Sequence, residues 1–161
     1  MGQCVAVTRR LLARKGTPSM KSSISGRCAC GAVHYEADTP PVFSMQCHCR
    51  DCQRATGSGH ANMAIFPRTS LRLHGEVRYH TVTTDMGHLA RRGFCPQCGS
   101  PVVGEPGAVP HLIGVHAASL DDPSVFAPSA VLYTKRAYPW DVTSAELPKF
   151  ETMMPPPPGA N

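Results

Sequence analysis

Seven of the eight cysteines in this 161-residue chain lie in three short groups. Within each group the cysteines are two or three residues apart, a spacing that brings sulfurs together around one metal ion. The groups are Cys28 and Cys30; Cys47, Cys49 and Cys52; and Cys95 and Cys98. A tetrahedral zinc site needs four ligands, and no group has four cysteines. The fold must therefore bring separate groups together or complete a site with another kind of ligand.

The cysteine pattern also indicates a compartment. Eight cysteines could form four disulfides in a secreted chain. The start of the chain, however, is a poor secretory signal, because its apolar stretch 11–13 is interrupted at once by Arg14 and Lys15. An arginine-rich start without acidic residues is also compatible with an organelle transit peptide. Metal-type spacing suits a reducing environment, so we predict a cytoplasmic protein.

Length and charge predict one domain with a tail at each end. Residues 1–20 form a basic, disordered leader, residues 21–150 the zinc domain, and residues 151–161 a proline-rich, disordered tail. The leader carries four of the five net positive charges, so the domain itself is close to neutral. A nucleic-acid partner usually requires a clustered basic face on the fold, which makes such a partner improbable here. No apolar run reaches the length of a membrane span, so we predict no membrane partner.

Short runs with β-forming residues or alternating polarity, separated by Gly and Pro, predict a compact, mainly β domain of antiparallel strands stapled by zinc. A hairpin turn is expected at residues 74–76. The segment Arg50–Thr56 predicts a single short helix, which ends at Gly57 in a left-handed conformation. The expected strands are residues 32–37, 42–46, 60–66, 71–73, 77–82, 88–94, 109–115 and 130–133.

Two cysteine pairs predict a structural zinc site. Cys28 and Cys30 can point to the same side of an extended segment, and Cys95 and Cys98 form a tight knuckle that ends in Gly99. Together they supply four thiolates, the ligand set of a closed site. Such a site would tie the start of the domain to its middle and contribute to folding. Disulfides, or a pairing of the first two cysteines with the other group, are the alternatives.

The three remaining cysteines predict a second, catalytic-type zinc site. Cys47 and Cys49 lie at the end of a strand, and Cys52 lies in the first turn of the helix, so one strand-to-helix turn can aim all three sulfurs at one point. A catalytic zinc keeps one position open for water or substrate. His48 or His60 could instead supply the fourth ligand. A further alternative is that all seven cysteines bind structural metals.

Basic side chains beside the second site offer a role in substrate binding. Zn²⁺ with three thiolates has a net charge of −1, which Arg50 and Arg54 could offset. They could also bind the carboxylates of an anionic thiol. The alternative is that both are solvent-facing arginines on the helix.

Four segments resemble the glutathione-dependent formaldehyde-activating enzyme family, also called the centromere protein V domain. The segments are GRCACGAVHY, CHCRDCQRATG, FCPQCG and KRAYPW, which occur in this order between Gly26 and Trp140. The resemblance implies a mainly β fold that is shared with a small zinc-binding Rab-exchange chaperone. It also implies a structural zinc and a catalytic-type zinc, two per chain, on the cysteines assigned above by spacing.

The resemblance further implies a carbon–sulfur lyase that joins glutathione and formaldehyde reversibly into S-hydroxymethylglutathione. In that reading a small thiol ionises on the second zinc and attacks an aldehyde. His48 or His60 could move the proton. Arg92 could bind substrate, with Tyr35 and Trp140 as further pocket residues or core residues. The competing hypotheses are a non-catalytic zinc-binding interaction module and a thiol redox or metal sensor.

Overall fold

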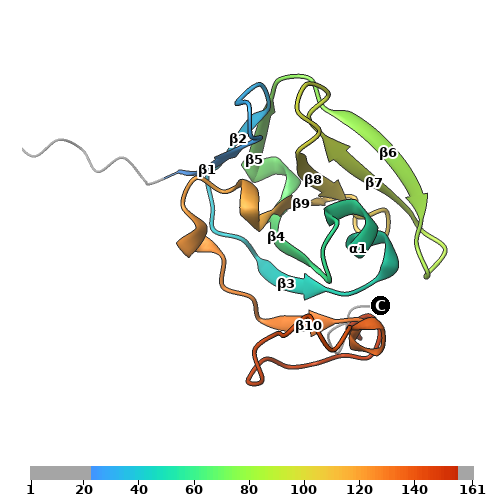
Figure 1. Ribbon diagram of the computed structural model, residues 1–161. Coiled ribbons are helices and arrows are strands. Elements are labelled where there is room, and N and C mark those ends of the chain that lie inside the picture. Colours follow the sequence, from blue (N-terminus) through green and yellow to red (C-terminus); the bar gives the residue numbers. More distant parts are fainter. Residues whose placement is uncertain (1–22, 156–161) are drawn as a thin grey trace, which may run out of the picture.

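The computed structural model describes residues 23–155 and consists of two β-sheets with one α-helix, α1 (Arg50–Thr56) (Figure 1). The small sheet has the order β1-β2-β5, with β1 (Ile24–Arg27), β2 (His34–Ala37) and β5 (Leu71–His74). The large sheet has the order β10-β3-β4-β9-β8-β7-β6. Its strands are β3 (Phe43–Cys47), β4 (Ala61–Pro67), β6 (Arg78–Thr83), β7 (Leu89–Phe94), β8 (Pro101–Glu105), β9 (Leu112–His116) and β10 (Ala130–Leu132). Single 3₁₀ turns occupy Arg68–Ser70, Ala117–Ser119, Pro123–Val125 and Thr134–Arg136.

The mainly β, antiparallel fold predicted from the sequence is confirmed, with one exception in strand direction. Every described strand pair is antiparallel except β10 with β3, which is parallel. The predicted helix has the bounds expected from the sequence, and Gly57 ends it with φ 64°. That left-handed residue donates its backbone N–H to the carbonyl of Gln53, which satisfies one of the free carbonyls at the end of the helix.

Two strands, β1 and β8, were not predicted, because tertiary contacts decide them. β1 contains Gly26, and a Cβ built there would lie 2.2 Å from the hydroxyl oxygen of Tyr35 on the paired strand. β8 begins with Pro101 and contains Gly104, two residues that weaken a strand signal in the sequence. Both segments become strands since a neighbouring strand pairs with them, and local propensity does not reveal that pairing.

The hairpin turn predicted at residues 74–76 is wrong. β5 pairs with β2 in the small sheet, whereas β6 pairs with β7 in the large sheet, so the chain crosses between sheets at this point. Gly75 has φ 86°, and a Cβ built there would lie 2.0 Å from the carbonyl oxygen of Ala32. Gly75 does adopt the left-handed backbone expected of a turn glycine, but it is needed for a close approach of two backbone segments and not for a hairpin.

The main core lies where the two sheets pack together. Its largest wholly buried side chains include Tyr35 of β2, Phe66 of β4 and Ile113 of β9. The Tyr35 hydroxyl forms a 2.9 Å hydrogen bond with the Ser119 hydroxyl, which pairs the one polar atom of this ring inside the core. Tyr35 is therefore a core residue, one of the two roles considered for it.

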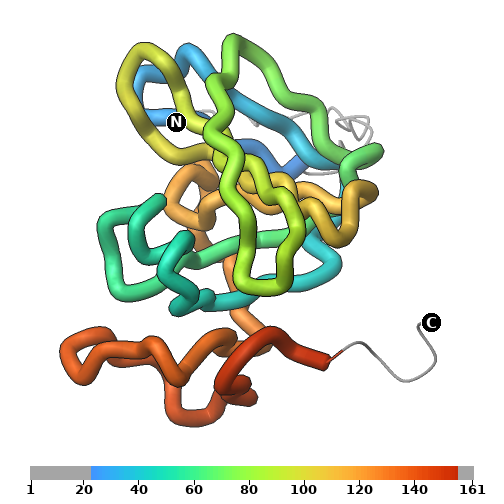
Figure 2. The backbone as a smooth tube through the Cα atoms, turned by 90° about the vertical axis from the view of Figure 1, so that its right-hand side faces the viewer, coloured from blue at the N-terminus to red at the C-terminus, as the bar shows by residue number. Residues whose placement is uncertain are grey.

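The C-terminal part of the chain forms a separate layer against β3. Figure 2 shows this part, in orange and red, beneath the rest of the molecule. β10 connects it to the large sheet, and the Phe150 N–H donates to the Val131 carbonyl at 2.9 Å. The Tyr133 N–H donates to the Thr152 carbonyl, so residues just beyond position 150 pair with the domain.

The predicted leader, and the tail beyond Pro155, lie outside the described residues. Within residues 23–155, no helix has the length and hydropathy needed to cross a membrane.

Two glycines with similar backbone angles allow the role of Gly75 to be tested. Gly87 has φ 79°, but a Cβ built there meets no atom within 4 Å. We expect Gly87→Ala to lower the free energy of unfolding by about 1–2 kcal/mol, from the left-handed backbone alone. Gly75→Ala should cost roughly 2–5 kcal/mol, because it adds a clash with backbone. Urea unfolding measures both, and equal losses would contradict the close approach.

Candidate functional site

The strand-to-helix turn between β3 and α1 brings three sulfurs together. Cys47 ends β3, Cys49 caps the N-terminus of α1, and Cys52 lies in its first turn. The Cys52 backbone N–H donates to the Cys49 sulfur at 3.4 Å, so the sulfur acts as the cap. The three sulfurs lie within 4.8 Å of one another. This set, Cys47, Cys49 and Cys52, is the cysteine triplet below.

Hydrogen bonding within the triplet favours a thiolate. Donation from the thiols of Cys47 and Cys52 lowers the pKa of Cys49 to about 2. The same contacts, with burial, raise the pKa of Cys47. A guanidinium nitrogen of Arg92 lies 4.0 Å from the Cys52 sulfur. Negative charge therefore has nearby compensation at this turn, as a site that binds a cation through thiolates requires.

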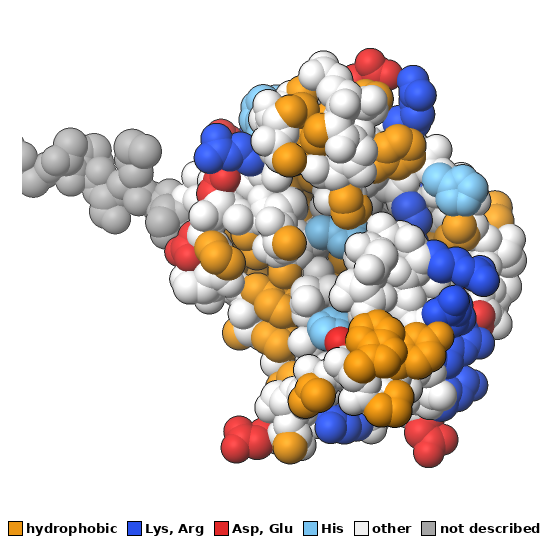
Figure 3. All heavy atoms as spheres, viewed as in Figure 1, with side chains coloured by type: hydrophobic (Ala, Val, Ile, Leu, Met, Phe, Trp, Pro, Cys, Tyr) orange, Lys and Arg blue, Asp and Glu red, His pale blue; other side chains and the backbone are white. Residues whose placement is uncertain are grey.

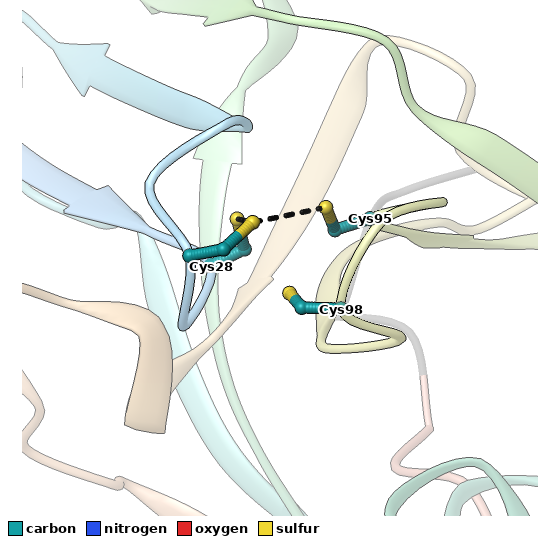
Figure 4. A group of neighbouring side chains, drawn as sticks. Cys28, Cys95 and Cys98 are labelled. Atoms are coloured by element: carbon teal, nitrogen blue, oxygen red, sulfur yellow. Dashed lines mark hydrogen bonds between the residues drawn. The ribbon is translucent and has the colours of Figure 1, made fainter.

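Four other cysteines form a second cluster, separate from the triplet. Cys28 and Cys30 come from the loop after β1, and Cys95 and Cys98 come from the connection between β7 and β8. Figure 4 shows the sulfurs of Cys28, Cys95 and Cys98 pointing toward a common centre. Two sulfur–sulfur distances are 3.5 Å (Cys28 to Cys30) and 3.7 Å (Cys30 to Cys95), and all four lie within 4.8 Å.

Both cysteine groups fit a zinc ion by their donor atoms and spacing. Zinc–sulfur bonds of about 2.3 Å in a tetrahedron place neighbouring sulfurs about 3.8 Å apart. The distances in the four-cysteine cluster match this spacing. That cluster offers four ligands and would be closed, whereas the triplet offers three and would leave one position open. All seven cysteines in the described part of the chain are free thiols.

The two histidines considered as ligands or bases join a different group. His48 is wholly buried, and its Nδ1 lies 3.3 Å from a carboxylate oxygen of Asp141. The His60 Nδ1 lies 2.8 Å from the same oxygen, and its Nε2 lies 3.2 Å from the amide nitrogen of Gln46. His60 therefore bridges Gln46 of β3 and Asp141 in the segment after β10, whereas neither ring nitrogen of His48 has a hydrogen-bond partner among the described residues. Neither histidine lines the cavity beside the triplet.

A cavity of about 370 Å³ opens beside the triplet. One wall consists of Cys47, Cys49 and Cys52, and the other walls are mainly apolar. The apolar side chains are Phe43, Met45, Met63, Ile65, Met86, Ala90, Ala108, Val109, Leu112, Leu132, Tyr133, Met153 and Met154. None of the cysteines of the four-cysteine cluster lines it. The three-sulfur group alone therefore faces a space that could hold a reactant.

A second cavity, of about 400 Å³, is lined by Asp51, Arg54 and Ala55 of α1, and it is named the cationic cavity below because Arg54 and Arg92 both line it. Its basic residues are Arg54, Arg92, His80 and His116. It shares Asp51 and Arg92 with the first cavity. Two of the three arginines proposed for substrate binding thus line a cavity. Arg50 lines neither, and its guanidinium instead donates to Gln53 and to the Tyr138 hydroxyl at 2.9 Å.

Tyr133 is a candidate site residue that sequence reasoning missed. It is the only non-glycine residue with positive φ in the described chain, at 59°, and it lines the cavity with the triplet. Such strain is maintained only where the surroundings enforce it, and here its backbone N–H is fixed by Thr152. Burial raises the pKa of the Tyr133 phenol, so it stays protonated at neutral pH. No pattern in the surrounding residues indicates this conformation.

Trp140 does not line either cavity. It is 68% exposed and stacks on Tyr138, with 5.2 Å between ring centroids. Figure 3 shows hydrophobic side chains gathered on the lower part of the molecule, where Figure 1 draws β10 and the segment after it. Trp140 therefore belongs to the surface of the C-terminal layer and not to the core or the pocket.

His116 predicts a specific pH dependence of stability. Burial, together with Arg92, lowers its pKa to about 4 in the folded chain, against about 6.5 when unfolded. As the pH falls below 6.5, the unfolded chain takes up the proton first. Stability should therefore fall between pH 6.5 and pH 4, by roughly 3 kcal/mol for this residue.

Urea unfolding from pH 7 to pH 4.5 tests this effect. His116→Gln should show a shallower loss of stability than the parent chain. His111→Gln, which removes an exposed imidazole, is the matched control and should follow the parent. An unchanged pH profile in His116→Gln would refute the prediction.

Comparisons with known proteins agree with this geometry. No curated protein gives a significant match. A crystal structure of a Rhodobacter sphaeroides protein superposes with a TM-score of 0.51 at 25% identity, covering 78% of this chain and 98% of that one. The sequence profile of the family described as glutathione-dependent formaldehyde-activating enzyme matches residues 23–136, which include all seven grouped cysteines. The chain therefore belongs to the glutathione-dependent formaldehyde-activating enzyme family.

Proposed function

We propose that this protein catalyses the reversible addition of a thiol to an aldehyde, the chemistry of a carbon–sulfur lyase. The observation that carries the proposal is that the cysteine triplet, with one ligand position left over, faces the cavity of about 370 Å³. The four-cysteine cluster has no such position, and none of its cysteines lines this cavity. Glutathione and formaldehyde, the reactants in the family's name, are the first pair to test.

Each cysteine group has a separate role in this proposal. The four-cysteine cluster would hold a structural zinc, and the triplet would hold a second, catalytic-type zinc. When bound, the second ion would supply a Lewis acid that lowers the pKa of a coordinated thiol. The residues around it must then bind the reactants, exclude water and transfer the thiol proton to the carbonyl oxygen.

Arg92 and Arg54 are suited to bind an anionic thiol. Arg92 lies beside the Cys52 sulfur and lines both cavities, so it links the reaction site to the cationic cavity. Arg54 lies in that cationic cavity with two histidines. Carboxylates of glutathione would find charge-assisted hydrogen bonds there. Arg50 is already bonded on the helix surface and is not part of this proposal.

Tyr133 is suited to control the proton. In the forward reaction a sulfur–carbon bond forms, the carbonyl oxygen becomes a hydroxyl, and the thiol proton finishes on that oxygen. A protonated phenol on the cavity wall can donate a hydrogen bond to the oxygen as its charge develops. His48 and His60 face Asp141 instead, so a catalytic role for them has no cavity contact to support it.

The chemistry also supports the cellular location predicted from the sequence. Thiol substrates and thiolate ligands both need a reducing environment, so we propose that the protein acts in the cytoplasm. A purely structural interaction module, or a redox or metal sensor, would not need a cavity at the triplet. The experiments below separate these functions.

Zinc analysis of matched cysteine variants tests the two-site arrangement. We expect two zinc ions per chain, one for each cysteine group. Cys49→Ser should retain one zinc and its fold, and lose thiol–aldehyde activity by at least about 10²-fold. Cys98→Ser should lose roughly 3 kcal/mol or more of unfolding free energy, because zinc binding there contributes to folding. Full activity in a folded Cys49→Ser protein would refute a catalytic triplet.

Removing one hydroxyl tests the role of Tyr133. Phenylalanine has the same backbone requirements, so Tyr133→Phe isolates the phenol group. We expect kcat to fall by about 10²-fold with little change in KM, because the hydrogen bond strengthens only as charge develops. Steady-state kinetics on zinc-loaded protein measure both constants. A rise in KM at unchanged kcat would assign Tyr133 to substrate binding instead.

A further inference from the structure

We infer that the aldehyde partner of this protein carries an apolar substituent, an aliphatic chain or an aromatic ring, that fills the cavity beside the triplet. The inference rests on the proposed function, since it takes the triplet as the place where the carbon–sulfur bond forms. The same addition occurs as with formaldehyde: the thiol sulfur bonds to the carbonyl carbon, and the proton finishes on the oxygen. The substituent takes no part in the chemistry and contributes binding.

The depth of the cavity is apolar. Met45, Met63 and Ile65 come from the paired strands β3 and β4, and Leu132 comes from β10. Met63 and Leu132 are buried, and the strand pairing fixes their positions. At about 370 Å³ the space lies within the usual range of about 300–1,000 Å³ for small-molecule sites. Formaldehyde, with one carbon, would leave almost all of it unfilled.

The rim of the cavity is apolar as well, and it is exposed. Met86 is 60% exposed, Met153 47% and Met154 37%, and all three line the same cavity. They come from two segments far apart in sequence, the β6–β7 turn and the end of the described chain. Methionine adapts its shape to varied apolar ligands. Clustered exposed apolar side chains at a concave site indicate a surface that a ligand covers.

Charge distribution assigns this space to the aldehyde and not to the thiol. Asp51 and Arg92 line both cavities, so they do not distinguish them. Asp85 and His88 line only the apolar cavity, whereas Arg54 lines only the cationic one. An anionic thiol such as glutathione would lose hydration in this cavity, where Arg92 is the one guanidinium and Asp85 opposes a negative charge. The cationic cavity provides Arg54 in addition to Arg92, and Asp85 does not line it. The apolar side is thus left for the other reactant.

An aldehyde series on the full-length, zinc-loaded protein tests the inference. Glutathione is held fixed while formaldehyde, acetaldehyde, hexanal, benzaldehyde and the anionic aldehyde glyoxylate are compared. Each kcat/KM is divided by the uncatalysed rate of the same pair, which removes differences in intrinsic reactivity. We expect the normalised value for hexanal to exceed that for acetaldehyde by at least about 10-fold, because each buried methylene adds to binding.

A binding measurement gives a readout that is independent of turnover. S-hexylglutathione resembles the adduct of glutathione with hexanal, and S-methylglutathione resembles the adduct with formaldehyde. Neither compound can release an aldehyde. Calorimetry should show at least about 10-fold tighter binding of the hexyl compound. The ratio of the two dissociation constants should fall toward one in the double variant Met86→Gln with Met153→Gln, since both rim side chains become polar. Val142→Thr, an exposed apolar residue that does not line the cavity, is the matched control and should keep the ratio.

The outcomes separate this inference from the proposed function. Equal binding of the two glutathione derivatives, or a normalised kcat/KM for formaldehyde or glyoxylate at least as high as for hexanal, overturns the inference and leaves thiol–aldehyde chemistry intact. The normalised kcat/KM could instead rise only when hexanethiol replaces glutathione, with formaldehyde as the aldehyde. That result would place the apolar group on the thiol and overturn its assignment to the aldehyde. No acceleration for any pair overturns the proposed function and this inference with it.

Discussion

The convergence of four thiols from two distant loops is the interaction on which the rest of the arrangement depends. One loop follows β1 of the small sheet, and the other lies between β7 and β8 of the large sheet. Thiols held this close repel one another once ionised, so a cation bound at their centre would stabilise the contact between the sheets. That contact positions the buried strands of the main core, which in turn support β3 and the turn that carries the triplet.

The alternation of side chains along β3 divides its end into two functions. Cys47 and Cys49 face the cavity, and His48 between them faces the opposite side and meets Asp141. The sulfur side faces the cavity, and the imidazole side lies against Asp141 of the C-terminal layer. The histidine beside the cysteines therefore lies outside the cavity, whereas the sulfurs, Arg92 and Tyr133 line it.

The two cavities beside α1 differ in polarity, and the difference matches the two halves of a thiol–aldehyde adduct. Arg92 belongs to both and lies beside the triplet, so it stands at the point where the halves would join. The cationic cavity suits a charged thiol, and the apolar cavity suits an uncharged carbonyl compound. The seven-residue helix α1 contributes to both cavities, with Cys52 lining the apolar cavity and Arg54 the cationic one.

The sequence by itself determined the mainly β class, the single helix with its end at Gly57, and the grouping of cysteines, because alternation, a left-handed glycine and ligand spacing are local properties. Only the tertiary structure decided which strands pair, that the chain crosses between sheets at Gly75, and that His48 and His60 turn away from the cavity. It also decided the position of Tyr133 and the apolar wall. These features depend on contacts between residues far apart in the chain, which no local pattern encodes.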